Sequence, residues 1–357
     1  MVRLGAMGDI LHALPAVTAL REAHPSWIID WVVEPRWREL LVAGFCGDRG
    51  LDCPDGNAAK PVVNELHLAA TRDWRKDPFS VATMRDIKAL RKSLKAGRYD
   101  VVLDMQGAIR SAVVGKFAGC RRMIGEAHPR EREARWLFTE MVATHGAHVI
   151  DQDVELAAAV AGDDLKPVRP WLPYDPEAEA WASDLLAWSP GRPQAARQTA
   201  VLINPGAGWG AKRWPVERYA TVAEALVNRG FRVLVNAGPG ERALAAAIAE
   251  RTHGVATSLN CSLGQLIALT RRVGLAIAGD TGPLHLACAL GRPVVGIYGP
   301  TDPSRNGPYG TRFKVLRSPI SKRDHTRLAA PEAGLLTIQP EDVMQAADEL
   351  LAEETQA

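Results

Sequence analysis

Short runs of consecutive apolar residues alternate along the chain with stretches whose apolar residues recur at helical spacing. Several runs are apolar almost throughout, as expected of parallel strands covered on both faces, and most are followed by glycine and then a helical stretch. The alternation predicts a doubly wound α/β fold. The predicted strands are residues 27–34, 99–107, 200–208, 231–240, 273–280 and 292–300.

A proline-rich stretch separates two such series of strands and helices. It spans residues 165–198 and contains one predicted helix around 176–188. A chain of 357 residues is long enough for two domains of ordinary size. We therefore expect two domains, residues 1–165 and 166–357, with the linker between them.

Composition narrows the class of protein. The chain has 43 Lys and Arg against 41 Asp and Glu, a formal charge of +2 that argues against general nucleic-acid binding. Its five cysteines include no CxxC pair, which argues against a disulfide framework or a zinc site and favours a reducing cytoplasm. No apolar run approaches the roughly 20 residues that span a bilayer, so we expect any membrane contact to be peripheral.

Four glycine-rich turns follow predicted strands or precede predicted helices. In open α/β sheets, ligands bind at the carboxyl ends of strands, where backbone N–H groups and helix N-termini meet anions. One such turn alone is more often a tight connection, but three in the second half favour a phosphate-bearing ligand there. The turns are "GAMGD" (5–9), "NPGAGWGAKRWP" (204–215), "NAGPGE" (236–241) and "GDTGPLHLA" (279–287).

Together these motifs resemble glycosyltransferase family nine, the ADP-heptose:lipopolysaccharide heptosyltransferases. The resemblance runs over nearly the whole chain. It is carried by "GAMGDILHALPAV" (5–17), "DWVVE" (30–34), "NPGAGWGAKRWP" (204–215) and "GDTGPLHLACALGRPVVGIYGPTDP" (279–303). The middle segments, residues 72–80, 100–112 and 130–138, are most similar to heptosyltransferase I.

The resemblance implies the GT-B fold, two Rossmann-like doubly wound domains that face a central cleft. The N-terminal domain is then expected to bind the acceptor and the C-terminal domain the ADP-sugar. GT-B chains commonly end in a helix that returns to the first half, so the helical pattern near 340–354 is expected to do the same.

The resemblance also implies an activity, the inverting transfer of L-glycero-D-manno-heptose from ADP-heptose to the Kdo region of the lipopolysaccharide inner core. The expected partners are ADP-heptose, Kdo-lipid A or core lipopolysaccharide, and the anionic inner membrane, which a cytoplasmic monomer would contact peripherally. Heptosyltransferase II or another core heptosyltransferase is the alternative within the family. Outside it, a GT-B nucleotide-sugar epimerase would need further acid/base residues, for which this sequence shows no motif, and a nucleotide-binding module would leave Asp9 and Lys212 unexplained.

Asp9 stands in the first glycine-rich turn. By resemblance it is the general base that takes the proton from the acceptor hydroxyl. The alternative is a purely structural role, in which Asp9 caps a helix that begins near Ile10.

The resemblance places the donor diphosphate against Lys212, whose compact charge on a long stem suits this role. Arg213 either supports Lys212 or is a solvated surface arginine. The backbone N–H groups of Thr281 and Gly282, at the positive end of a helix dipole, suit the pyrophosphate.

Three further donor-side residues admit two interpretations each. Asp280 either lies near the sugar hydroxyls or holds its loop, because charge repulsion makes it a poor phosphate ligand. His285 is either a ligand or a core histidine. Glu241 either accepts from a ribose hydroxyl or is a first-turn helix carboxylate.

No Asp-x-Asp pair follows a predicted strand; "DQD" (151–153) opens a helical pattern, where acidic residues are routine. A lysine and a helix N-terminus supply the positive charge that a metal would provide, so we expect no required metal and no cofactor.

Basic residues outnumber acidic residues two to one between Arg72 and Arg135. Residues 87–98 have the helical period of a solvated face, whereas 71–76 do not. By resemblance, the cations of the acceptor side bind Kdo carboxylates and lipid A phosphates. They are Arg72, Arg75, Lys76, Arg110 and Arg132. The same surface, with Trp74 and Trp136, is suited to an anionic membrane leaflet.

Overall fold

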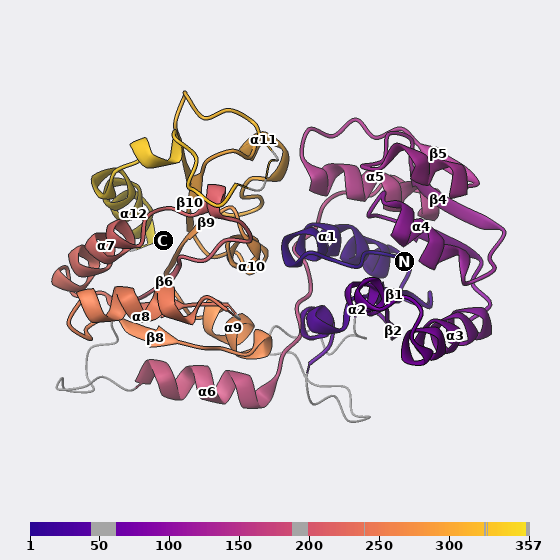
Figure 1. The fold of residues 1–357 in the computed structure, drawn as a ribbon, viewed down its shortest axis with the longest axis horizontal. Helices are drawn as coiled ribbons and strands as arrows, with labels where there is room; N and C mark the ends of the chain where they lie inside the picture. The colour runs from indigo at the N-terminus through magenta and orange to yellow at the C-terminus, as the bar shows by residue number, and fades with distance from the viewer. Residues whose placement is uncertain (44–61, 188–198, 239, 325, 327, 355–357) are drawn as a thin grey trace. The chain divides into compact units, whose positions relative to one another are not determined.

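The computed structural model describes the whole chain except residues 44–61, 188–198, 239, 325, 327 and 355–357 (Figure 1). The chain divides into two compact units, Met1–Pro173 and Tyr174–Ala357. The division falls inside the predicted linker, whose last part, 188–198, lies outside the described residues. The helix predicted within the linker is α6 (Pro176–Ala187).

The sheet of the first unit is parallel, and the start of the chain lies at its centre. The strand β1 pairs with β2 on one side, while β3 pairs with β4 and β4 with β5 on the other. Val2 bridges both groups, to Val32 of β1 and to Asp104 of β3. The strands are β1 (Asp30–Val33), β2 (Glu65–Leu68), β3 (Val101–Asp104), β4 (Arg122–Glu126) and β5 (Glu140–Val142).

Five α-helices and two 3-10 helices accompany this sheet in the described residues. The helix α1 packs against α5, and its residues from Ile10 to Arg21 are buried. It begins at Met7, not near Ile10 as expected, so Asp9 lies within its first turn. The helices are α1 (Met7–Ala23), α2 (Thr71–Lys76), α3 (Val81–Ala96), α4 (Ile109–Lys116), α5 (Val149–Ala161), η1 (Pro35–Leu40) and η2 (Arg132–Leu137).

The second unit contains a six-stranded parallel sheet in the order β11-β10-β9-β6-β7-β8. The strand order reverses between β6 and β9, because the chain builds outward from β6 in one direction and then from β9 in the other. The strands are β6 (Ala200–Asn204), β7 (Arg232–Asn236), β8 (Thr257–Leu259), β9 (Leu275–Gly279), β10 (Val294–Tyr298) and β11 (Phe313–Arg317).

Helices cover both faces of this sheet, as its continuous apolar runs predict. On one face Val201 and Ile203 of β6 share a core with helices α7 and α12, and on the other Ala276 and Ala278 of β9 pack with α10. The remaining helices are α7 (Val216–Asn228), α8 (Arg242–Arg251), α9 (Leu263–Thr270), α10 (Gly282–Ala289), α11 (Pro303–Asn306), α12 (Pro340–Glu354), η3 (Gly210–Lys212) and η4 (Leu335–Thr337).

The last helix, α12, packs against α7, β10 and β11 of its own unit. Its expected return to the first half concerns the placement of one unit relative to the other and stays a prediction. Among the helices that the structure describes, none is both long and apolar enough to cross a membrane.

Several elements were not predicted. The strands β2, β5 and β8 have only three or four residues, and exposed positions interrupt their apolar pattern. The helix α2 has six residues, too few for a helical period to show.

Candidate active site

Each sheet places a glycine-rich turn where its strand order reverses. In the first unit, the residues after Leu4 leave the sheet between β1 and β3. In the second, residues 205–215 follow β6, and Asp280 follows the neighbouring β9. Ligands of doubly wound folds bind at such reversal points, so both turns are candidate site segments.

Asp9 is the third residue of α1, and one of its oxygens has a structural role. Its Oδ2 accepts a hydrogen bond from the Ala6 N–H at 2.9 Å, while its Oδ1 lies 3.7 Å from a guanidinium nitrogen of Arg3. The side chain is 40% exposed. Asp9 therefore stabilises the start of the helix and is also open to a substrate, so its two predicted roles are compatible.

Buried polar groups that the sequence analysis missed lie beneath this turn. Asp104, at the end of β3, accepts hydrogen bonds from the N–H groups of Gln106 and Gly107 and from the Ser111 hydroxyl. Burial raises the pKa of Asp104 to about 6 despite these bonds and the charge of Arg3. The Gln106 side chain accepts from the Leu4 N–H at 2.7 Å, which fixes the chain just before the turn.

The cations predicted for the acceptor side come from three elements of the first unit. Arg72, Arg75 and Lys76 lie on α2, Arg110 in the first turn of α4, and Arg132 in η2. Lys76 pairs with Asp73 at the surface, N to O 2.7 Å.

Buried Glu34, directly after β1, holds the start of α2. Its Oε1 accepts from the Thr71 hydroxyl and from the Arg72 N–H. The charges of Arg72 and Arg110 also act on Arg36 in η1, a residue the sequence analysis missed although it lies only two positions after "DWVVE".

In the second unit, Lys212 meets Asp280 across the strand-order reversal. The Lys212 Nζ lies 2.5 Å from the Asp280 Oδ2, and the His285 Nε2 lies 3.2 Å from the Asp280 Oδ1. Burial by itself raises the pKa of this carboxyl, but the hydrogen bond from His285 and the charge of Lys212 hold it well below its usual range. Asp280 thus fixes the position of the Lys212 ammonium group and links its own loop to α10. His285 is buried and is bound to Asp280.

The helix α10 begins beside this ion pair. Thr281 is its N-cap, yet the Thr281 side chain does not cap the helix; its hydroxyl donates to the Gly279 carbonyl at 3.2 Å. The backbone N–H groups of Thr281 and Gly282 therefore have no side-chain acceptor from the N-cap. A helix start next to an ammonium group is suited to a diphosphate.

The side chains of Glu241 and Arg213 both contact the loop after β6. The Glu241 carboxylate lies over Gly206, where a Cβ would come within 1.9 Å of its Oε2. Arg213 donates to the Ala207 carbonyl and lies 3.8 Å from the Glu241 Oε1. Arg213 is therefore tied to this loop, although its side chain is 45% exposed.

A distant segment covers η3 and was not predicted to belong to the site. The Ala211 N–H donates to the Leu328 carbonyl at 3.0 Å, and the Glu332 N–H donates to the Ala211 carbonyl at 3.1 Å. A Cβ at Gly210 would come within 1.7 Å of the Ala329 carbonyl. Residues 328–332 thus fix the backbone that carries Lys212.

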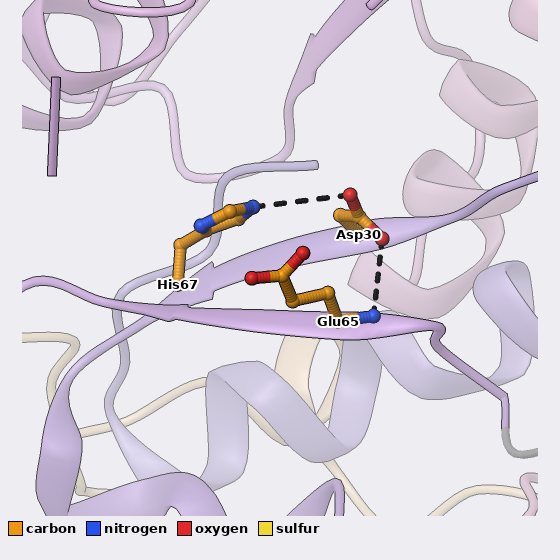
Figure 2. A group of neighbouring side chains, drawn as sticks. All are labelled: Asp30, Glu65 and His67. Atoms are coloured by element: carbon orange, nitrogen blue, oxygen red, sulfur yellow. Dashed lines mark hydrogen bonds and ion pairs between the residues drawn. The ribbon is translucent and has the colours of Figure 1, made fainter. Parts of the chain in front are cut away.

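Figure 2 shows Asp30, Glu65 and His67, whose potential metal-ligand atoms lie within 4.8 Å of one another. Hydrogen bonds already engage the Asp30 carboxylate: its Oδ1 accepts from the Glu65 N–H and its Oδ2 from the Tyr99 hydroxyl. Asp30 and Glu65 are the first residues of β1 and β2, so they lie at the opposite end of these strands from the glycine-rich turn. We interpret this group as a structural network. The expectation that activity needs no metal stays a prediction.

Comparison with known protein families gives a match to glycosyltransferase family 9 (heptosyltransferase) over residues 87–333. The chain is 30% identical to lipopolysaccharide heptosyltransferase 1 of Escherichia coli K12, over 89% of this chain and 93% of the relative. It is 25% identical to lipopolysaccharide heptosyltransferase 2 of the same strain, over 98% and 97%.

Solved structures give the same result. The E. coli heptosyltransferase WaaC with ADP superposes with a TM-score of 0.75 at 28% identity and covers 98% of both chains. The E. coli ADP-heptose lipopolysaccharide heptosyltransferase II superposes with a TM-score of 0.74 at 22% identity, over 99% of this chain and 98% of that one. The predicted GT-B class, with two Rossmann-like units, is confirmed.

Proposed function

Because this chain belongs to glycosyltransferase family 9, the heptosyltransferases, we propose that it transfers L-glycero-D-manno-heptose from ADP-heptose to the Kdo region of the lipopolysaccharide inner core. The observation that carries the donor assignment is the Lys212–Asp280 pair beside the open start of α10. WaaC, which resembles this chain, has been solved with ADP and with ADP-2-deoxy-2-fluoro heptose.

In the proposed donor site, Lys212 and the N-terminal N–H groups of α10 bind the diphosphate. The entering phosphates compete with Asp280 for the ammonium group, and His285 retains the Asp280 carboxylate in place. The same cation and N–H groups stabilise the negative charge that develops on ADP as the bond between the anomeric carbon and the phosphate oxygen breaks. This positive charge replaces a metal, so we propose that the reaction is metal-independent.

In the proposed acceptor step, Asp9 is the general base. An acceptor hydroxyl attacks the anomeric carbon from the face opposite ADP and transfers its proton to the Asp9 carboxylate. One C–O bond forms and one breaks, which inverts the configuration at the anomeric carbon. The 40% exposure of the Asp9 side chain supports this assignment.

The acceptor group is expected to be anionic. Arg72, Arg75, Lys76, Arg110 and Arg132 bind its carboxylates or phosphates in this proposal. Exposed Trp136 and the basic surface of the first unit support peripheral contact with the anionic cytoplasmic face of the inner membrane. We also propose that the protein acts as a cytoplasmic monomer.

The decisive assay offers purified protein ADP-heptose together with either Kdo-lipid A or heptosylated Kdo-lipid A. We expect heptose transfer to Kdo-lipid A, detected by mass spectrometry. Transfer only to the heptosylated acceptor would instead identify a heptosyltransferase II activity, the alternative that the 25% identity to that relative keeps open. No transfer to either acceptor would contradict the proposal.

A further inference from the structure

Two arginines of the first unit, Arg72 and Arg110, lie close enough to a third, Arg36, for their charges to act on it. Burial lowers the pKa of Arg36, the charges of Arg72 and Arg110 lower it further, and Glu34 opposes them. All three arginines are exposed, and each comes from a different element: η1, α2 and α4. Because like charges repel, the fold has to hold such a group together.

Trp37 positions Arg36. The Arg36 guanidinium lies 4.3 Å from the centre of the Trp37 ring, a favourable cation–π distance. The indole in turn packs on Gly5, where a Cβ would come within 2.5 Å of its Nε1. The stacked pair therefore lies against the turn that leads to Asp9.

Backbone hydrogen bonds position the elements that carry the other two arginines. The Arg72 N–H donates to Glu34 at 3.2 Å, which ties α2 to the end of β1. The Ile109 N–H donates to the Glu131 Oε2 at 2.8 Å, which fixes the first turn of α4 and so the backbone of Arg110. Among the described residues, neither the Arg72 nor the Arg110 guanidinium group forms a hydrogen bond.

The group has more cations than counter-ions. Within the described part of the chain, the guanidinium groups of Arg36, Arg72 and Arg110 form no ion pair with a carboxylate. The one carboxylate acting on Arg36, that of Glu34, already accepts two hydrogen bonds at Oε1 from the start of α2. An anion bound between the three guanidinium groups would relieve their mutual repulsion.

We propose that Arg36 is a further binding residue of the acceptor site, and that with Arg72 and Arg110 it binds one oxyanion group, a carboxylate or a phosphate, of the acceptor. The inference rests on the proposed function. Planar guanidinium groups form paired hydrogen bonds to both kinds of oxyanion, which a lysine cannot do. The contact between Trp37 and Gly5 places this anion site beside the turn that carries Asp9.

The test compares Arg36→Gln with Arg38→Gln, which removes a second exposed arginine from η1 and changes the net charge equally. Binding of Kdo-lipid A in detergent micelles and the KM values of both substrates are measured for each. We expect Arg36→Gln to weaken acceptor binding about 10-fold and to leave the KM for ADP-heptose unchanged. Arg36→Lys, which retains the charge but not the planar group, should recover part of the loss. Equal effects of Arg36→Gln and Arg38→Gln would overturn the inference.

A second acceptor, Kdo-lipid A without its lipid phosphates, identifies the oxyanion. If the Arg36→Gln defect disappears with this acceptor, the group is a phosphate; if it persists, the group is a sugar carboxylate. Native protein that binds Kdo-lipid A but transfers no heptose would refute the proposed function, and the binding comparison would still decide the role of Arg36. Native protein that does not bind Kdo-lipid A would overturn the inference.

Discussion

Each unit has a buried aspartate at the carboxyl end of a strand that flanks the strand-order reversal, yet the two pKa values move in opposite directions. Asp104 ends β3 and accepts hydrogen bonds from neutral donors, and burial raises its pKa to about 6 despite these bonds and the charge of Arg3. Asp280 follows β9 and meets both Lys212 and His285, which hold its pKa well below the usual range. Aspartates at equivalent positions in two similar sheets thus have pKa shifts of opposite sign.

The two proposed binding sites differ in how their cations are neutralised. In the second unit Lys212 already pairs with Asp280, so in the proposed donor site a diphosphate competes with that carboxylate for the ammonium group. In the first unit Arg36, Arg72 and Arg110 form no ion pair with a carboxylate among the described residues, so in the proposed acceptor site an anionic ligand supplies the missing negative charge. The cation of the proposed donor site thus has a counter-ion within the protein, whereas these three arginines of the proposed acceptor site have none among the described residues.

The largest expected effect is that of Asp9→Asn, which tests whether the first unit supplies a general base as well as cations that bind the acceptor. Asparagine retains the volume and an oxygen that accepts from the Ala6 N–H, but it is no base. We expect the kcat of heptose transfer to fall about 100-fold or more, with the KM for ADP-heptose and the Tm nearly unchanged.

The control for this variant is Asp86→Asn, which removes a different exposed helical carboxylate of the first unit, on α3. It should leave the kcat unchanged. Near-normal turnover by Asp9→Asn would reduce Asp9 to its structural role at the start of α1.

Asparagine at position 104 tests the opposing pKa shifts. Because the folded pKa of Asp104 lies above its unfolded value, the folded state binds more protons between those two values, and ionisation destabilises it as pH rises. Relative to the native protein, the unfolding free energy of Asp104→Asn should therefore increase by about 3 kcal/mol between about pH 3 and about pH 7, as measured by urea titration.

Asp280→Asn should behave in the opposite way. The ionised form of Asp280 stabilises the fold above the unfolded pKa of an aspartate, and this stability is lost as pH falls through the lower folded pKa. The variant should therefore be less stable than the native protein at neutral pH. Parallel pH profiles for the two variants would contradict the comparison.

Lys212→Met tests the role of the Lys212–Asp280 pair in donor binding and has the smallest expected effect of these four variants. The substitution retains the length of the stem and removes the cation, so the Kd for ADP should rise about 10-fold by calorimetry. Lys314→Met, which removes a lysine paired with Glu349 elsewhere in the unit, should not change it. Unchanged ADP binding by Lys212→Met, or loss of native turnover with EDTA and recovery with Mg²⁺, would break the proposed donor mechanism.

The parts of the fold that the sequence predicted have strong local signals. The strands β6, β7, β9 and β10 are buried at nearly every position, so their apolar runs are continuous. The short strands β2 and β5 give no such run, because β2 has exposed residues at both ends and no residue of β5 is buried. The first residues gave a weak signal as well: Met1–Leu4 is central only because Val2 bridges two strands from later in the chain.

The sequence by itself was enough to predict two doubly wound units, the family, and the turns that carry Asp9 and Lys212. Apolar periodicity and glycine-rich turns are local properties of a chain, so they can be read without the fold. Only the tertiary structure decided which charges meet. Lys212 pairs with Asp280, which is 68 positions away in the chain, and the charges of Arg72 and Arg110 act on Arg36 although the three arginines lie far apart in the chain. Strand pairing brings these charged groups together, and burial determines how strongly they interact. The opposite pKa shifts of Asp104 and Asp280 therefore follow from the fold and not from the residue types alone.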